Sequence, residues 1–127
     1  MSEPWNVSIR QALAAAKEVD ITPIDADGTR RASRTIWSIG VDDELYVRSW
    51  KGRGAVWFRE ALAAGQGELT VTGGGTSQLV RFEEVDAAAS VQAQISAAFL
   101  TKYAADGNAG AMNEDAPVSA TLRVLSR

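Results

Sequence analysis

Residues 48–62 contain the side chains best suited to binding an anion. A run of alternating residues ends at Trp50, a glycine-flanked basic turn follows, and a helical pattern begins directly after it. This order predicts a strand, a turn and a helix N-terminus. Backbone N–H groups and the positive end of the helix dipole would lie beside Lys51 and Arg53, which suits a phosphate or a carboxylate. Both side chains could instead be ordinary solvated turn residues.

The chain contains neither histidine nor cysteine. Their absence removes the commonest general base, the thiol nucleophile and the usual ligands of transition metals. No pair of carboxylates has a spacing that favours acid–base catalysis. We therefore predict no metal site and no identifiable catalytic residue, and we expect a bound cofactor to supply any difficult chemistry.

Basic residues are concentrated in one part of an acidic chain. Residues 30–59 carry seven basic and three acidic side chains, whereas the remainder carries six basic and thirteen acidic ones, giving −3 in total. A single basic region favours a small anionic ligand over a nucleic acid, whose binders usually present a broad basic face. Single-strand nucleic-acid binding through arginines and tryptophans is a third, disfavoured hypothesis.

Two further arginines and three tryptophans lie in the same region. Arg34 and Arg48 are expected on neighbouring antiparallel strands, where they could grip an anion from one face or simply point to solvent. Packing in the core or at a dimer interface is the ordinary role of Trp37 and Trp57. Trp50 follows its strand into the turn and is the best candidate to lie against a planar ring.

Length and composition predict a single domain, residues 1–127, with 46% hydrophobic and 23% charged residues. No segment is long and apolar enough to span a bilayer, so we expect no membrane partner. The N-terminus lacks the basic start and apolar run of a secretory signal, which predicts a cytoplasmic protein.

Hairpin signals outnumber crossover signals along the chain. A helix is expected from near Pro4 to Lys17, a three-stranded antiparallel meander over 18–50, and a mobile loop over 106–117. The other expected elements are helices at 55–64 and 86–103 and strands at 69–72, 78–85 and 120–125. The pattern predicts an α+β fold, an antiparallel barrel-like sheet of about six strands with about three flanking helices.

The stretch 27–72 resembles the flavin- and deazaflavin-binding split β-barrel superfamily. The resemblance is to its deazaflavin-dependent nitroreductase-like branch and to an allied uncharacterised family. Residues 28–35 (Gly-Thr-Arg-Arg-Ala-Ser-Arg-Thr) are similar to a Gly-Arg-rich hairpin of that branch. Residues 49–52 (Ser-Trp-Lys-Gly) and 57–62 (Trp-Phe-Arg-Glu-Ala-Leu) resemble its Ser-Lys-Gly-Gly turn and the helix after it. Trp50 is an extra residue in this turn, and Glu60 replaces an asparagine.

The resemblance implies a split β-barrel that binds FMN or a deazaflavin coenzyme and passes a hydride to a small organic substrate. It also implies a homodimer, with Trp37 and its strand at the interface. The residues expected to bind the cofactor are Arg34, Thr35, Arg48, Ser49, Trp50, Lys51, Gly52, Arg53 and Trp57. The alternative is a non-enzymatic module of the same fold, binding a small molecule or acting as a dimeric scaffold.

Overall fold

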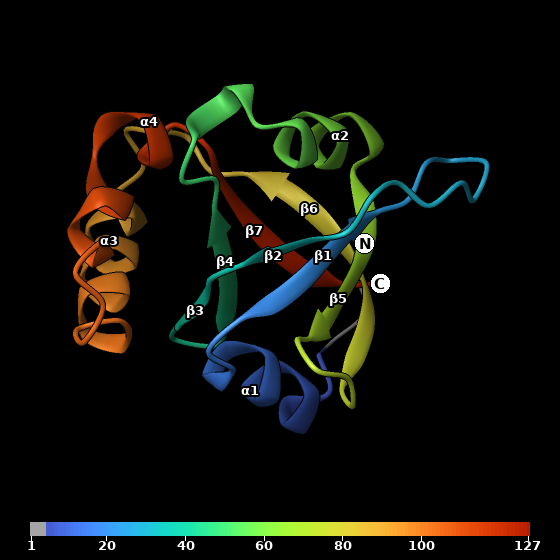
Figure 1. Cartoon of the computed structure of the whole chain (residues 1–127), viewed down its shortest axis with the longest axis horizontal. Helices are drawn as coiled ribbons and strands as arrows, with labels where there is room; N and C mark the ends of the chain where they lie inside the picture. The colour runs from blue at the N-terminus through green and yellow to red at the C-terminus, as the bar shows by residue number, and fades with distance from the viewer. Residues whose placement is uncertain (1–4) are drawn as a thin grey trace.

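The computed structural model describes residues 5–127 and contains seven strands. They are β1 (Val19–Pro23), β2 (Arg34–Ile36), β3 (Ser38–Val41), β4 (Glu44–Arg48), β5 (Gln66–Val71), β6 (Ser77–Glu84) and β7 (Thr121–Ser126). All pairings are antiparallel, and the strand order β2-β1-β5-β6-β7-β4-β3 curves into a nearly closed barrel (Figure 1). The predicted α+β split barrel is confirmed, with one more strand than expected.

Helical elements lie outside this sheet. They are α1 (Val7–Ala15), α2 (Val56–Ala64), α3 (Val91–Lys102), the short α4 (Asp115–Val118) and two 3-10 turns, η1 (Gly52–Gly54) and η2 (Ala109–Asn113). In Figure 1, α1 lies at one end of the barrel, α2 and η1 lie at the other, and α3 and α4 flank its side. Within residues 5–127, no helix is long and apolar enough to cross a membrane.

The split of the barrel lies at Trp37. One continuous strand over 34–41 and a meander over 18–50 were expected, but β2 pairs with β1 while β3 pairs with β4 at the opposite edge of the sheet. No pairing joins β2 to β3 in the described part of the chain. At Trp37 the chain passes from one edge to the other, and the indole stacks on Tyr103 with ring centroids 3.9 Å apart. The meander prediction was wrong because strand alternation does not reveal which edge a strand joins.

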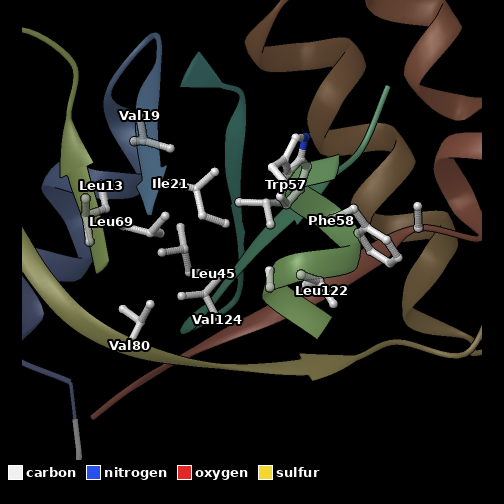
Figure 2. Packing of buried hydrophobic residues seen from close by; sticks show 13 residues of the cluster. Leu13, Val19, Ile21, Leu45, Trp57, Phe58, Leu69, Val80, Leu122 and Val124 are labelled. Atoms are coloured by element: carbon white, nitrogen blue, oxygen red, sulfur yellow. The ribbon is translucent and has the colours of Figure 1, made fainter. Parts of the chain in front are cut away.

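The barrel interior is filled by alternating apolar side chains from the strands, closed by α1 and α2. Val19 and Ile21 of β1 are fully buried, as are Leu122 and Val124 of β7. Figure 2 shows these side chains converging with those of α2. The helix α2 ends at Ala64, and its C-cap Gly65 has a φ of 70°, the left-handed conformation that glycine adopts without strain.

A second core lies between α3 and the outer face of the sheet. Ile95, Phe99 and Tyr103 face inward and pack with Ile39 and Tyr46. This layer covers the outer face of β4 while the barrel core covers its inner face. As a result, four consecutive residues of β4, Leu45 to Arg48, are buried.

Several element boundaries differ from the sequence prediction. The segment 106–117 was expected to be a mobile loop but contains η2 and α4. Helix α1 is capped by Asn6, whose Oδ1 accepts the amide of Ile9 at 3.1 Å, and the predicted start at Pro4 lies outside the described residues. Strand β7 lies between β6 and β4 and so joins the two halves of the sheet.

Candidate functional site

A pocket of about 560 Å³ opens where the barrel is split. Its walls come from β2 and Trp37, the end of β4, the turn that leads into α2, and η2. The lining residues are Arg34, Thr35, Ile36, Trp37, Arg48, Ser49, Trp50, Lys51, Gly54, Ala55, Val56, Trp57, Asn108 and Met112. Seven of the nine predicted site residues therefore meet in one cavity.

The hydroxyl of Ser49 is the most unusual polar group of this pocket. Ser49 is fully buried, and its Oγ has no hydrogen-bond partner within residues 5–127. Its backbone N–H is used, because it donates to the carbonyl of Ala120 at 3.0 Å. A buried hydroxyl without a partner costs free energy, which distinguishes Ser49 from the other polar residues of the lining.

The N-terminus of α2 reaches the same cavity through Ala55, Val56 and Trp57. Ala55 is the N-cap and offers no side-chain hydrogen bond to the amides of the first turn. An uncapped helix start leaves N–H groups and the positive end of the dipole available to an anion. The turn before α2 therefore adopts the strand–turn–helix arrangement predicted from the sequence.

All charged residues that line the pocket are cationic. Arg34 and Lys51 are exposed at its rim and Arg48 lies beneath, whereas no lining residue is a carboxylate. None of the three forms an ion pair with a described residue. The pocket thus has positive potential in a chain whose formal charge is −3, which favours anionic ligands.

Arg48 is 1% exposed, and protein oxygens accept all of its donor groups. Its Nε donates to Thr121 Oγ1 at 3.0 Å, and its Nη2 donates to Gln92 Oε1 at 2.6 Å. Its Nη1 donates to Ser96 Oγ, Asn113 Oδ1 and the Met112 carbonyl, each at 3.0–3.1 Å. Burial lowers the pKa of Arg48 to about 10, so the guanidinium remains charged at neutral pH. It contributes charge to the pocket but has no free N–H group for a ligand.

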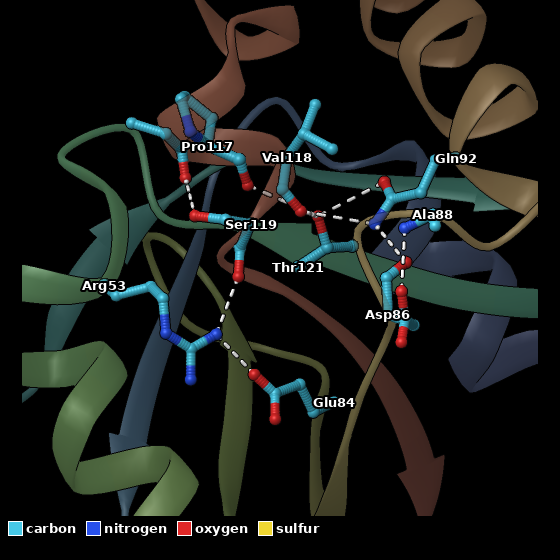
Figure 3. Close-up of polar contacts among 10 residues, drawn as sticks. Arg53, Glu84, Asp86, Ala88, Gln92, Pro117, Val118, Ser119 and Thr121 are labelled. Atoms are coloured by element: carbon cyan, nitrogen blue, oxygen red, sulfur yellow. Dashed lines mark hydrogen bonds and ion pairs between the residues drawn. The ribbon is translucent and has the colours of Figure 1, made fainter.

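Gly52 and Arg53 do not line the pocket. The one-turn helix η1 directs Arg53 toward the opposite side, where its Nη1 pairs with Glu84 and donates to the carbonyl of Ser119 at 2.7 Å (Figure 3). Its guanidinium also lies over the ring of Phe58, 5.4 Å from the centroid. Gly52 is buried with φ of 75°, and a Cβ there would meet Ala116 at 3.2 Å. The contacts of both residues therefore stabilise the turn, and neither side of the pocket is formed by them.

The remaining predicted residues differ in exposure. Trp50 is 59% exposed at the pocket mouth, whereas Trp57 is 7% exposed and belongs to the barrel core. Thr35 is exposed on β2, and its Oγ1 donates to Asp20 Oδ1 at 2.7 Å. Sequence reasoning missed Asn108 and Met112, because it treated their segment as a mobile loop.

The sequence matches, over residues 10–124, the family described as "Uncharacterized protein conserved in bacteria (DUF2255)". The chain belongs to this family. No curated protein matches the chain.

Three solved structures with the same fold are similar to this family member. An FAD-binding protein from Mesorhizobium loti is 20% identical with a TM-score of 0.61, covering 98% of this chain and 91% of its own. The heme storage protein HutZ from Vibrio cholerae is 10% identical with a TM-score of 0.65, covering 98% and 90%. An F420 reductase is 13% identical with a TM-score of 0.52, covering 98% and 94%. These similarities confirm the split-barrel fold that the sequence indicated.

Proposed function

We propose that this protein binds FMN or a deazaflavin coenzyme in the pocket at the split of the barrel. The carrying observation is the buried, unpartnered hydroxyl of Ser49 beside the uncapped N-terminus of α2. Lys51 lies on the same turn and forms no ion pair with a carboxylate of residues 5–127. A phosphate group would supply the acceptor oxygens that all three features require.

The dimensions and chemistry of the pocket suit such a cofactor. Its volume of about 560 Å³ lies within the usual range for small-molecule sites, roughly 300–1,000 Å³. Trp50 and Trp57 provide aromatic surface for a planar ring, and Arg34 adds charge at the rim. When bound, the cofactor would supply hydride transfer to a small organic substrate. The residues of this chain would bind the phosphate, orient the ring and limit its contact with water.

A haem ligand is less compatible with the residues of this chain. The heme storage protein HutZ has a similar fold. Haem iron in proteins is usually held by histidine or cysteine, and this chain has neither. The basic rim and aromatic walls are more compatible with a phosphorylated planar cofactor.

Binding without turnover is the second candidate function. The lining residues include no histidine, cysteine or carboxylate to serve as a general acid near neutral pH. A module that stores or presents a small anionic aromatic molecule would need only the pocket. Oxidation of the bound, reduced cofactor by a panel of nitroaromatic and quinone substrates would separate the two functions, because a binding module would show no substrate-dependent rate.

We further propose a homodimer that covers the pocket mouth. Trp50 and Val56 are 59% and 53% exposed there, and a second subunit would bury them. Trp37 is half-buried beside the same opening and could contribute to the interface. Light scattering of a micromolar solution should give twice the chain mass of 13.5 kDa, and a monomer mass would contradict the proposal.

The cofactor proposal is tested by comparing FMN with riboflavin, which lacks the phosphate. We expect Lys51→Ala to weaken FMN binding about tenfold to a hundredfold, because one charge-assisted hydrogen bond is lost, and to leave riboflavin binding nearly unchanged. Lys17→Ala is the matched control, since the Lys17 side chain is exposed and does not line the pocket. Equal FMN titrations for wild type and Lys51→Ala, or no FMN or deazaflavin binding by wild type, would refute the proposed site.

A further inference from the structure

We propose that Arg48 is the positioning residue of the pocket: its guanidinium holds η2 and the preceding N-cap residue, which supply Met112 and Asn108 to the lining, against the end of β4. The sequence suggested that Arg48 would bind the ligand directly. Because its N–H groups already donate to protein oxygens, Arg48 instead positions the residues that line the pocket. The ligand-binding part of this inference rests on the proposed function, whereas the structural part does not.

The contacts of Arg48 join segments that are far apart in the chain. Its Nη1 donates to the carbonyl of Met112 and to Asn113 Oδ1, which are both in η2. The same nitrogen donates to Ser96 Oγ on α3, while Nη2 donates to Gln92 on that helix. Arg48 therefore links the segment that forms one pocket wall to α3 and to the end of β4 by hydrogen bonds, in addition to the packing of Ala109 and Met112 in the second core.

A series of aromatic contacts in the second core connects Arg48 to another wall of the pocket, at Trp37. Arg48 lies over the ring of Phe99 at 5.4 Å from the centroid, Phe99 contacts Tyr103, and Tyr103 stacks on Trp37. Both ends of this series, Arg48 and Trp37, line the cavity. Displacing Arg48 would thus loosen two walls of the pocket.

The number and arrangement of the acceptor oxygens around residue 48 match an arginine side chain and not a lysine side chain. The planar guanidinium presents five N–H groups in a fixed arrangement, whereas a lysine ammonium presents three from one point. All the acceptors are neutral oxygens, so replacing a partner leaves no unpaired buried carboxylate. Variants in these partners are therefore expected to fold, with a local effect on η2.

The test uses Ser96→Ala and Asn113→Ala, each of which removes one acceptor of Arg48 without changing a lining residue. Ser90→Ala is the matched control, because Ser90 is exposed, directly precedes α3 and makes no capping hydrogen bond with its side chain. Hydrogen exchange should become about tenfold faster over residues 108–114 in Ser96→Ala and Asn113→Ala, with β5 and β6 unchanged. A general loss of stability would instead accelerate exchange throughout the barrel.

FMN titration is the second readout, carried out well below the melting temperature. We expect FMN to bind roughly fivefold more weakly to Ser96→Ala and to Asn113→Ala, and with unchanged affinity to Ser90→Ala. Arg48→Lys keeps the charge but not the planar donors, so it should also bind FMN more weakly than the wild type does. Wild-type exchange over 108–114 in both partner variants would overturn the inference. An FMN affinity equal to that of the wild type, in both partner variants or in Arg48→Lys, would also overturn the inference. If the wild type bound no FMN, the proposed function would fail, and the exchange measurement would still decide the role of Arg48.

Discussion

The arginines on the outer surface of the barrel and the cations around the pocket are held in different ways. Outside, Arg30 pairs with Glu68 at 2.9 Å, and Arg31 pairs with Asp25 at 2.6 Å. Arg123 lies between Glu83 and Glu44. These side chains are partly exposed, and each has a carboxylate to neutralise it.

Around the pocket and its supporting layer, cations have no carboxylate partner. Arg34 and Lys51 form no ion pair with a described residue, and Arg48 is held by neutral oxygens. Lys102 donates to the carbonyls of Ala14 and Ser38, both at 2.5 Å. The difference indicates that Arg30, Arg31 and Arg123 are neutralised within the fold, whereas the charges of Arg34, Arg48 and Lys51 are not neutralised by a described carboxylate and can attract an anion.

The largest expected effect is on the free energy of unfolding, which should fall much more when the buried Arg48 is replaced than when an exposed arginine is replaced. Arg48→Met should lower the free energy of unfolding by about 3 kcal/mol or more, because several buried acceptors lose their donor. Arg30→Met should lower it by about 0–1 kcal/mol, since its ion pair is solvent-exposed. Urea denaturation would measure both. Similar losses in the two variants would remove the contrast.

Two buried serines sharpen the same comparison. Ser38 Oγ donates to the Leu13 carbonyl at 2.7 Å, so Ser38→Ala should cost about 1–3 kcal/mol of stability and leave FMN affinity unchanged. Ser49→Ala should cost no stability, because its hydroxyl has no partner, yet weaken FMN binding about threefold to tenfold. Thermal denaturation and FMN titration of both variants should give opposite patterns, and a destabilised Ser49→Ala would contradict the ligand role.

The pH dependence of stability tests the half-buried cation Lys102. Burial lowers its pKa to about 8, below the ordinary 10.5, so the unfolded chain binds more protons between these values. Its contribution to stability should therefore rise with pH through that window and fall as pH drops through 8. Burial raises the pKa of the neighbouring Tyr103 to about 12, so Tyr103 opposes this trend only above pH 10. Urea midpoints from pH 7.5 to 9.5 should rise more for wild type than for Lys102→Met, and parallel curves would contradict the assignment.

The smallest expected effect concerns the exposed rim. Arg34→Gln should weaken FMN binding about twofold to fivefold at low salt, with the difference shrinking at high ionic strength. Arg30→Gln is the outer-surface control and should have no effect. Titrations at two salt concentrations would test this, and equal loss in both variants would mean that position on the surface is unimportant.

Much of the site could be predicted because its residues are close in the sequence. Residues 44–64 form one strand–turn–helix segment, and periodicity identifies both the strand and the helix, although β4 ends at Arg48 and not at the predicted Trp50. The order of hairpins likewise predicted an antiparallel α+β fold. These features depend on local patterns, which one sequence contains in full.

Other features depend on contacts that local patterns do not encode. Alternation treats one face of β4 as exposed, but α3 covers that face and buries Arg48. Met112 and Asn108 reach the pocket from a segment about sixty residues further along the chain. The direction of Arg53 depends on the tight turn of η1, which places residues two apart on opposite sides.

The surroundings of Arg48 also constrain the order in which the molecule can be completed during synthesis. Its hydrogen-bond partners lie 44 to 73 residues further along the chain. While the N-terminal part leaves the ribosome, the guanidinium must remain hydrated, and the binding cavity cannot acquire its second wall. Contacts of such long sequence separation are expected to form after the folding transition state, so substitutions at Arg48 should mainly accelerate unfolding and leave the folding rate nearly unchanged. Stopped-flow denaturant-jump kinetics would reveal this as a displaced unfolding arm.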